Sequence, residues 1–93
     1  MYLVRTGNTG VYANFRIDDS EAIMVVINLT GAPVTDYKIN LQNIQLKDGT
    51  YQLKSLYGPE TSSTLTVINQ SVSNDQPINE LKPYGIYVYQ LVP

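Results

Sequence analysis

The chain has 93 residues, 43% of them hydrophobic, and it contains no Cys, His or Trp. This length predicts a single domain over residues 1–93. Without Cys there is no disulfide framework and no thiolate ligand, and without His the commonest general base is missing. Six basic and eight acidic residues give a net charge of −2, which excludes the basic footprint of a nucleic-acid binder. No apolar run reaches the length of a membrane span. We therefore expect a structural or binding module without a cofactor, and neither a nucleic acid nor a membrane as partner.

The first third of the sequence has the patterning of strands and turns. Residues 11–17 are apolar at odd positions, and this two-residue period predicts a half-buried strand. The polar segment 18–21 has the length of a hairpin turn. Residues 22–29 are apolar on both faces until Asn28, and their β-branched content favours a strand over a helix. The segment 30–33 has the composition of a turn.

Similar patterns continue to the end of the chain. Strands are predicted at 37–41, 50–57, 64–68 and 84–92, with Ile44 and Leu46 either extending the first of them or forming a bridging piece. Turn signals at Asp48-Gly49 and Gly58-Pro59 bound the second of these strands. Two alternatives stay open for residues 72–81, namely a helical turn that starts at Pro77 and an edge strand.

These elements define the fold class. No segment repeats its apolar residues every three to four positions, so we expect no amphipathic helix. About seven or eight short strands separated by turns predict an all-β fold, an antiparallel β-sandwich of the Greek-key type. Ser, Thr, Asn and Gln together outnumber the charged residues two to one. Such a surface favours a bacterial extracellular or periplasmic protein over a cytoplasmic one.

Two strands carry more apolar residues than a sandwich needs. Segments 22–29 and 84–92 are apolar on both faces, although each sheet of a two-sheet sandwich buries only one face. A loop of this chain, another copy or a neighbouring domain could cover the outer face. The alternative is that tyrosine is tolerated at solvent-facing strand positions. We favour a neighbouring domain.

Four segments share an order of motifs with a known module. Val11-Tyr12-Ala13-Asn14-Phe15-Arg16 is close to V-Y-A-F-x-R, and Val25-Val26-Ile27-Asn28-Leu29-Thr30 fits V-V-x-N-x-[ST]. Asp48-Gly49-Thr50-Tyr51-Gln52-Leu53 leads to Tyr57-Gly58, and residues 81–91 fit L-x-P-Y-x-x-x-V-[YL]-x-L. Together they resemble the C-terminal all-β domain of the α-amylase family of glycoside hydrolases, from about Asn8 to Val92. Asn14 departs from the first motif, and the segment after Gly58 has no matching pattern.

The resemblance implies a part of a larger hydrolase of carbohydrate metabolism. In that family three acidic catalytic residues belong to a preceding (β/α)₈ barrel, and none of the barrel motifs occurs here. The chain would then be the non-catalytic C-terminal sandwich that packs on the barrel and stabilises it, in some cases with a secondary contact to α-glucan such as starch. The alternatives are an independent carbohydrate-binding module and a fibronectin-like spacer or adhesion domain.

The acidic residues do not suggest a catalytic site. A glycosidase needs two carboxyl groups about 5–9.5 Å apart across a cleft, whereas Asp18, Asp19 and Glu21 share one predicted turn. We interpret them as turn residues, with a weak Ca²⁺ site at Asp18 and Asp19 as the alternative. No G-x-S-x-G elbow is present. We therefore predict no catalytic residue and no metal site.

The tyrosines are the candidates for carbohydrate binding. Sugar C–H faces stack on exposed aromatic rings beside amides or hydroxyls. The candidate rings are Tyr51, Tyr57, Tyr87 and Tyr89, and the possible polar partners are Gln52, Asn69 and Gln90. We favour the alternative that these tyrosines pack in the core or against the neighbouring domain, since sugar-binding surfaces more often include Trp.

Four residues are predicted to have structural roles: Phe15, Asn28, Pro83 and Tyr84. An Asn near the end of a strand can bond its own backbone, so Asn28 is expected to shape the turn into Thr30. Tyr84 lies between Pro83 and Gly85. This position resembles a corner at which a Tyr hydroxyl bonds a backbone group.

Overall fold

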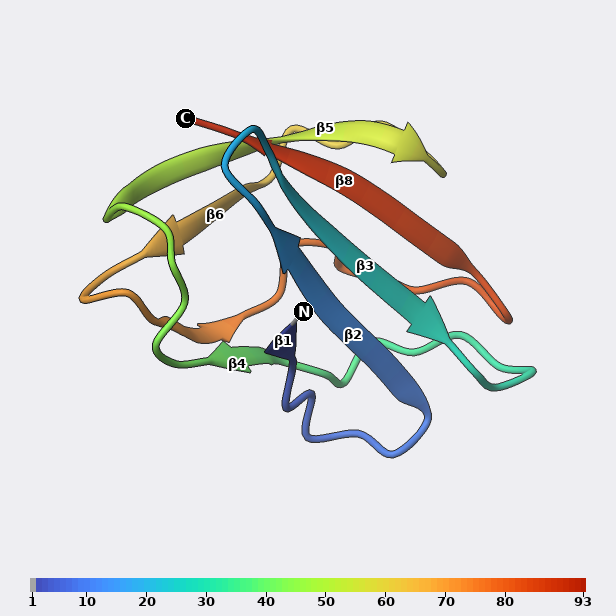
Figure 1. The fold of residues 1–93 in the computed structure, drawn as a ribbon. Coiled ribbons are helices and arrows are strands. Elements are labelled where there is room, and N and C mark those ends of the chain that lie inside the picture. The colour runs from blue at the N-terminus through green and yellow to red at the C-terminus, as the bar shows by residue number, and fades with distance from the viewer. Residues whose placement is uncertain (1) are drawn as a thin grey trace.

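The computed structural model describes residues 2–93, and all of its regular elements are strands. They are β1 (Tyr2–Leu3), β2 (Val11–Ile17), β3 (Ala22–Asn28), β4 (Ile39–Leu41), β5 (Gly49–Tyr57), β6 (Thr64–Val67), β7 (Val72–Asp75) and β8 (Ile86–Val92). Six of them form an antiparallel sheet in the order β1-β2-β3-β8-β5-β6, and β4 pairs with β7 in a second sheet (Figure 1). The prediction of an all-β antiparallel sandwich is confirmed.

The large sheet is organised around its last strand. β8 lies between β3 and β5 and pairs antiparallel with both, so that strands far apart in the sequence become neighbours (Figure 1). The alternation along β3 explains its place, because Ala22, Met24, Val26 and Asn28 are buried while the residues between them are partly exposed. The two-residue period therefore separates one face turned to the core from one turned outward.

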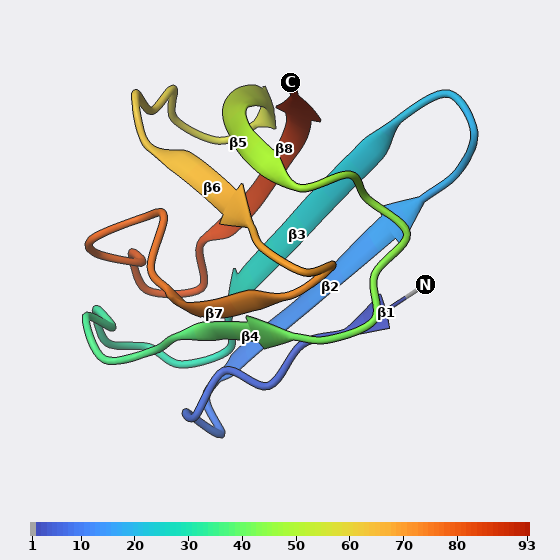
Figure 2. The same ribbon diagram turned by 90° about the vertical axis from the view of Figure 1, so that its left-hand side faces the viewer.

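The N-terminal segment joins the two sheets. Tyr2 pairs with Phe15 of β2, whereas Arg5 forms an antiparallel bridge with Asn40 of β4. Figure 2 shows β4 and β7 side by side as a layer apart from β2 and β3. The segment that starts at β1 thus leaves the large sheet and closes one side of the sandwich.

The core lies between these two layers. Its largest fully buried apolar side chains come from both sheets and from the loops: Phe15, Met24, Val26, Tyr37, Ile39, Ile44, Leu65, Val67, Val72, Leu81 and Tyr89. Phe15, predicted to be structural, is fully buried at its centre. No helix in residues 2–93 is long and apolar enough to cross a membrane.

Several boundaries differ from the sequence-based expectation. β4 begins at Ile39, and Ile44 is buried in the core from a loop instead of extending the strand. Of residues 72–81 only Val72–Asp75 form a strand. Pro77 starts no helix, and Leu81 makes a single bridge to Val34. These residues follow tertiary contacts, which local propensity does not encode.

Candidate functional site: an apolar outer sheet face

The face of the large sheet that points away from β4 and β7 is unusually apolar. The register places Tyr12, Ile27 and Ile86 in one row across β2, β3 and β8. The next row contains Asn14, Val25, Val88 and Tyr57. With Ile23, the apolar members of these rows form a surface that we call the outer apolar face: Tyr12, Ile23, Val25, Ile27, Tyr57, Ile86 and Val88.

This surface is accessible to solvent. Ile86 is 43% exposed and Tyr57 is 61% exposed, while Val25 and Val88 are partly exposed. Strand propensity does not require these residue types, because Thr forms strands as readily and would keep the face polar. A contiguous apolar patch on a folded domain is typical of an interaction surface.

The apolar surface continues past the strand ends. Leu29 follows β3 and is 56% exposed, and Tyr84 precedes β8 and is 68% exposed. The Tyr84 ring lies over Gly31, where a Cβ would stand 3.3 Å from its hydroxyl oxygen. Exposed apolar side chains therefore gather at the end of the sheet where Ile27 and Ile86 lie.

The charged side chains of this face have one sign. Arg16, Ile23, Gln90 and Lys54 form a third row across β2, β3, β8 and β5. Arg16 and Lys54 are both exposed, and the described outward positions of these four strands hold no acidic residue. The face combines an apolar surface with two cations at one end.

Asn14 interrupts the apolar rows. Its Nδ2 donates to the Tyr12 hydroxyl at 2.9 Å, but its buried Oδ1 has no partner within residues 2–93. The residue is 8% exposed and is flanked in register by Leu3 and Val25. A buried acceptor without a hydrogen bond carries a desolvation cost.

Three of the four candidate sugar-binding tyrosines are in the core, which is the alternative that the sequence analysis favoured, so they offer no ring to a sugar. Tyr51, Tyr87 and Tyr89 are 7%, 2% and 0% exposed. Tyr51 and Tyr89 donate to the carbonyls of Lys47 and Pro59, and the Tyr87 hydroxyl accepts from the Lys82 N–H. A ring with both faces covered cannot stack on a sugar.

Tyr57 is different because β5 contains an irregularity. The pairing with β8 shifts between Ser55 and Tyr57, so that Tyr57 lies opposite Val88. Without this bulge Tyr57 would continue the inward series of Tyr51 and Leu53. The bulge places Tyr57 on the outer apolar face.

Tyr84 does not have the corner role predicted from its neighbours. In the described chain its hydroxyl has no hydrogen-bond partner; instead its N–H donates to the Thr30 carbonyl. Its φ of 54° and a 2.9 Å bond from the Gly85 N–H to the Lys82 carbonyl define a turn with Pro83 at its second position. Pro83 and Tyr84 are thus structural through their backbones.

Tyr37 makes the hydroxyl contact that was expected of Tyr84. Its hydroxyl donates to the Ile78 carbonyl at 2.8 Å and accepts from the Ile78 N–H at 3.0 Å. Burial raises the pKa of Tyr37 to about 12. No local motif marked Tyr37, because its partner is 41 residues away.

Asn28 connects three segments from the end of β3. Its Nδ2 donates to the carbonyls of Ala32, Leu81 and Lys82, and its Oδ1 accepts from the N–H and the hydroxyl of Thr30. The contact with Thr30 is the one the sequence predicts. The contacts with Leu81 and Lys82 attach the turn before β8, which the sequence does not reveal.

Two aspartates are engaged by backbone groups of turns. Asp18 Oδ1 accepts from the N–H and hydroxyl of Ser20 and from the Glu21 N–H, and these bonds lower its pKa. The interpretation as a turn residue therefore accounts for Asp18. The carboxylate of Asp48 accepts hydrogen bonds from the N–H groups of Gln70 and Asn69, and these bonds lower its pKa. Sequence reasoning identified Asp48 only as a turn signal.

Comparisons with known proteins add no identification. No protein-family model matches the chain, and neither curated proteins nor solved structures show a significant match. The resemblance to the α-amylase family therefore rests on the four motifs alone.

Proposed function

We propose that this chain is a non-catalytic docking domain that packs its outer apolar face on a neighbouring domain. The observation that carries the proposal is the pair of apolar rows across β2, β3, β8 and β5. The motif resemblance supplies the identity of the neighbour, a (β/α)₈ barrel of an α-amylase-family glycoside hydrolase. The role of the chain is to cover and stabilise that barrel.

The size of the outer apolar face is sufficient for such a role. Burying a Val or Ile side chain completely contributes about 1.5–3 kcal/mol, and most of these residues are already partly buried. Covering the remaining area of seven side chains contributes on the order of 5 kcal/mol. Because linked domains meet at a high effective concentration, this suffices for a persistent contact.

The structure weakens both alternatives. A spacer or adhesion domain gives no reason for an apolar outer sheet face. A carbohydrate-binding module needs several exposed rings, and three of its four candidates lie in the core. Among the four candidate rings Tyr57 alone is exposed, and its row neighbour is Val88.

Two steps test the proposal. The coding sequence upstream of this chain should encode a (β/α)₈ barrel with three acidic catalytic residues. In that longer polypeptide, Val88→Lys places a charge at the centre of the outer apolar face. The matched control is Thr35→Lys, at an exposed position in the loop before β4.

The two variants should differ only when the barrel is attached. We expect Val88→Lys to lower the melting temperature of the barrel to that of the barrel alone, while Thr35→Lys leaves it unchanged. In the isolated chain both variants should melt within a few degrees of the wild type. Equal effects of the two variants in the longer polypeptide, or the absence of a barrel upstream, would refute the proposal.

A further inference from the structure

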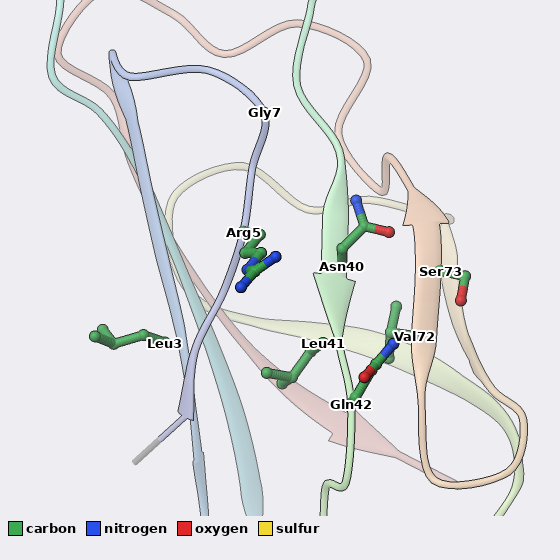
Figure 3. A pocket seen from close by; sticks show the side chains of 8 residues that line it. All are labelled: Leu3, Arg5, Gly7, Asn40, Leu41, Gln42, Val72 and Ser73. Atoms are coloured by element: carbon green, nitrogen blue, oxygen red, sulfur yellow. The ribbon is translucent and has the colours of Figure 1, made fainter.

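A pocket of about 550 Å³ lies beside the second sheet, between the N-terminal segment, β4 and the start of β7 (Figure 3). This volume is in the range of small-molecule sites. Its polar lining comes from Arg5, Asn40, Gln42 and Ser73, and its apolar lining includes Leu41 and Val72.

Backbone pairing brings the two central polar residues together. Arg5 and Asn40 are partners in an antiparallel bridge, with two N···O distances of 3.2 Å between their main chains. Directly paired residues project to the same side of a sheet. Both side chains therefore lie on the same side of the paired segments, and Figure 3 shows both at the pocket.

The orientation of the Asn40 amide is fixed by a third strand. Its Oδ1 accepts the N–H of Asn74 at 2.9 Å, and Figure 3 shows this oxygen on the side of β7. Only the oxygen can accept that bond, so the Nδ2 group remains as a hydrogen-bond donor on the other side.

The pocket is rich in donors and carries one positive charge. Arg5 is the only charged residue among its described lining residues. The ion pair found in residues 2–93 joins Lys82 to Glu80, so Arg5 has no carboxylate partner there. A guanidinium is always protonated and presents a planar set of donors that suits carboxylate and phosphate oxygens.

We propose that this pocket binds a small ligand through an oxyanion group, a carboxylate or a phosphate. Arg5 and the Nδ2 of Asn40 hold the oxygens, and the partly exposed Leu41 contacts an apolar portion of the ligand. The proposal is independent of the docking role, because none of the seven residues of the outer apolar face lines the pocket.

NMR titration of the ¹⁵N-labelled chain tests this site directly. Inorganic phosphate, acetate and butyrate are added at constant ionic strength. We expect saturable shifts of the amides of Arg5, Asn40 and Ser73. If the carboxylates produce them, butyrate should bind more tightly than acetate because of the apolar lining. If phosphate alone produces them, the ligand group is a phosphate.

Three variants separate a site from a general charge effect. Arg5→Gln should weaken binding at least about tenfold. Asn40→Asp keeps the acceptor for Asn74 but places a carboxylate beside Arg5, and it should abolish binding. Lys54→Gln removes a cation from the large sheet and should change nothing.

Three outcomes overturn the proposal. They are shifts that do not saturate with any of the three anions, unchanged affinity in Arg5→Gln or Asn40→Asp, and equal weakening in Lys54→Gln. A dispersed amide spectrum shows that each variant is folded, so a loss of binding can be assigned to the pocket.

Discussion

Asn28 provides the sharpest test of how the fold is held together. Its side chain is 0% exposed and all its hydrogen-bonding groups are used. Replacing it with Ala removes the link between β3, the following loop and the turn before β8. We expect Asn28→Ala to be among the most destabilising single substitutions in the chain.

The magnitude follows from the contacts. A hydrogen bond contributes about 1 kcal/mol net, and a buried donor without a partner costs more. The carbonyls of Leu81 and Lys82 stay bonded to the N–H groups of Val34 and Gly85, which limits the loss, whereas the Thr30 N–H loses its Asn28 acceptor. The sum is about 3–4 kcal/mol, a large part of the stability of a domain of this size.

Urea unfolding followed by circular dichroism and tyrosine fluorescence measures this loss. The midpoint should fall while the slope with denaturant stays constant, because the folded state is otherwise unchanged. The melting temperature should drop by on the order of 20 °C. A loss below about 1 kcal/mol would refute the reasoning.

Asn28→Asp is the matched variant. It keeps an acceptor for Thr30 but directs a second carboxylate oxygen at three carbonyls. These oxygens and burial raise the pKa of the new carboxyl, so its penalty is present at neutral pH and disappears below about pH 4. Asn28→Asp should therefore be less stable than Asn28→Ala at pH 7, and the gap should close in acid. A stability difference between the two variants that does not depend on pH contradicts this account.

Three further predictions concern single positions. Asp48 has a lowered pKa, so its contribution to stability is present above about pH 4 and is lost as the pH falls. Asp48→Asn should lower the melting temperature at neutral pH and make the melting temperature fall less steeply toward acid pH. A variant whose melting temperature falls as steeply as that of the wild type argues against this. Asn14→Val removes the unpartnered acceptor but also the hydrogen bond to Tyr12. Calorimetry should show that the free energy of unfolding rises by about 1 kcal/mol, and a clear fall in that free energy contradicts this prediction. Gly85→Ala would place a Cβ 2.8 Å from the Tyr87 hydroxyl oxygen, and urea unfolding should show a loss of about 1–3 kcal/mol; a wild-type midpoint contradicts it.

The regular strands of the large sheet could be predicted from the sequence. Residues 11–17 coincide with β2, and 22–29 exceeds β3 by one residue. The two-residue period carries this information because one face is buried and the other is not. β1 has only two residues and exists because Tyr2 and Leu3 pair with β2. A strand this short leaves no periodic signal.

The direction of the tyrosines could not be predicted. β8 is apolar at every position from Ile86 to Tyr89, so its pattern does not tell which face is buried. The register with β3 decides it, since Tyr87 and Tyr89 pair with the buried Val26 and Met24. The bulge in β5 similarly reverses the direction expected for Tyr57. Both features depend on strand pairing, which sequence period alone does not determine.

The outer apolar face was predicted in part and the pocket was not. The doubly apolar segments 22–29 and 84–92 indicated a surface that needs a cover, and β3 and β8 lie side by side in the middle of that surface. The pocket depends on the pairing of Arg5 with Asn40, which is 35 positions away in the sequence. No local pattern contains such a pairing.

Hydroxyl-radical footprinting gives the most direct test of the docking role. Tyr57 and Ile86 lie on the outer apolar face, whereas Ile68 is not one of its residues and lies in the turn between β6 and β7. Tyr57 and Ile68 are almost equally exposed, at 61% and 63%. In the longer polypeptide that includes the barrel, Tyr57 and Ile86 should be strongly protected relative to the isolated chain, while Ile68 should react as before. Unchanged reactivity of Tyr57 and Ile86 would contradict the claim that this face docks on a neighbouring domain.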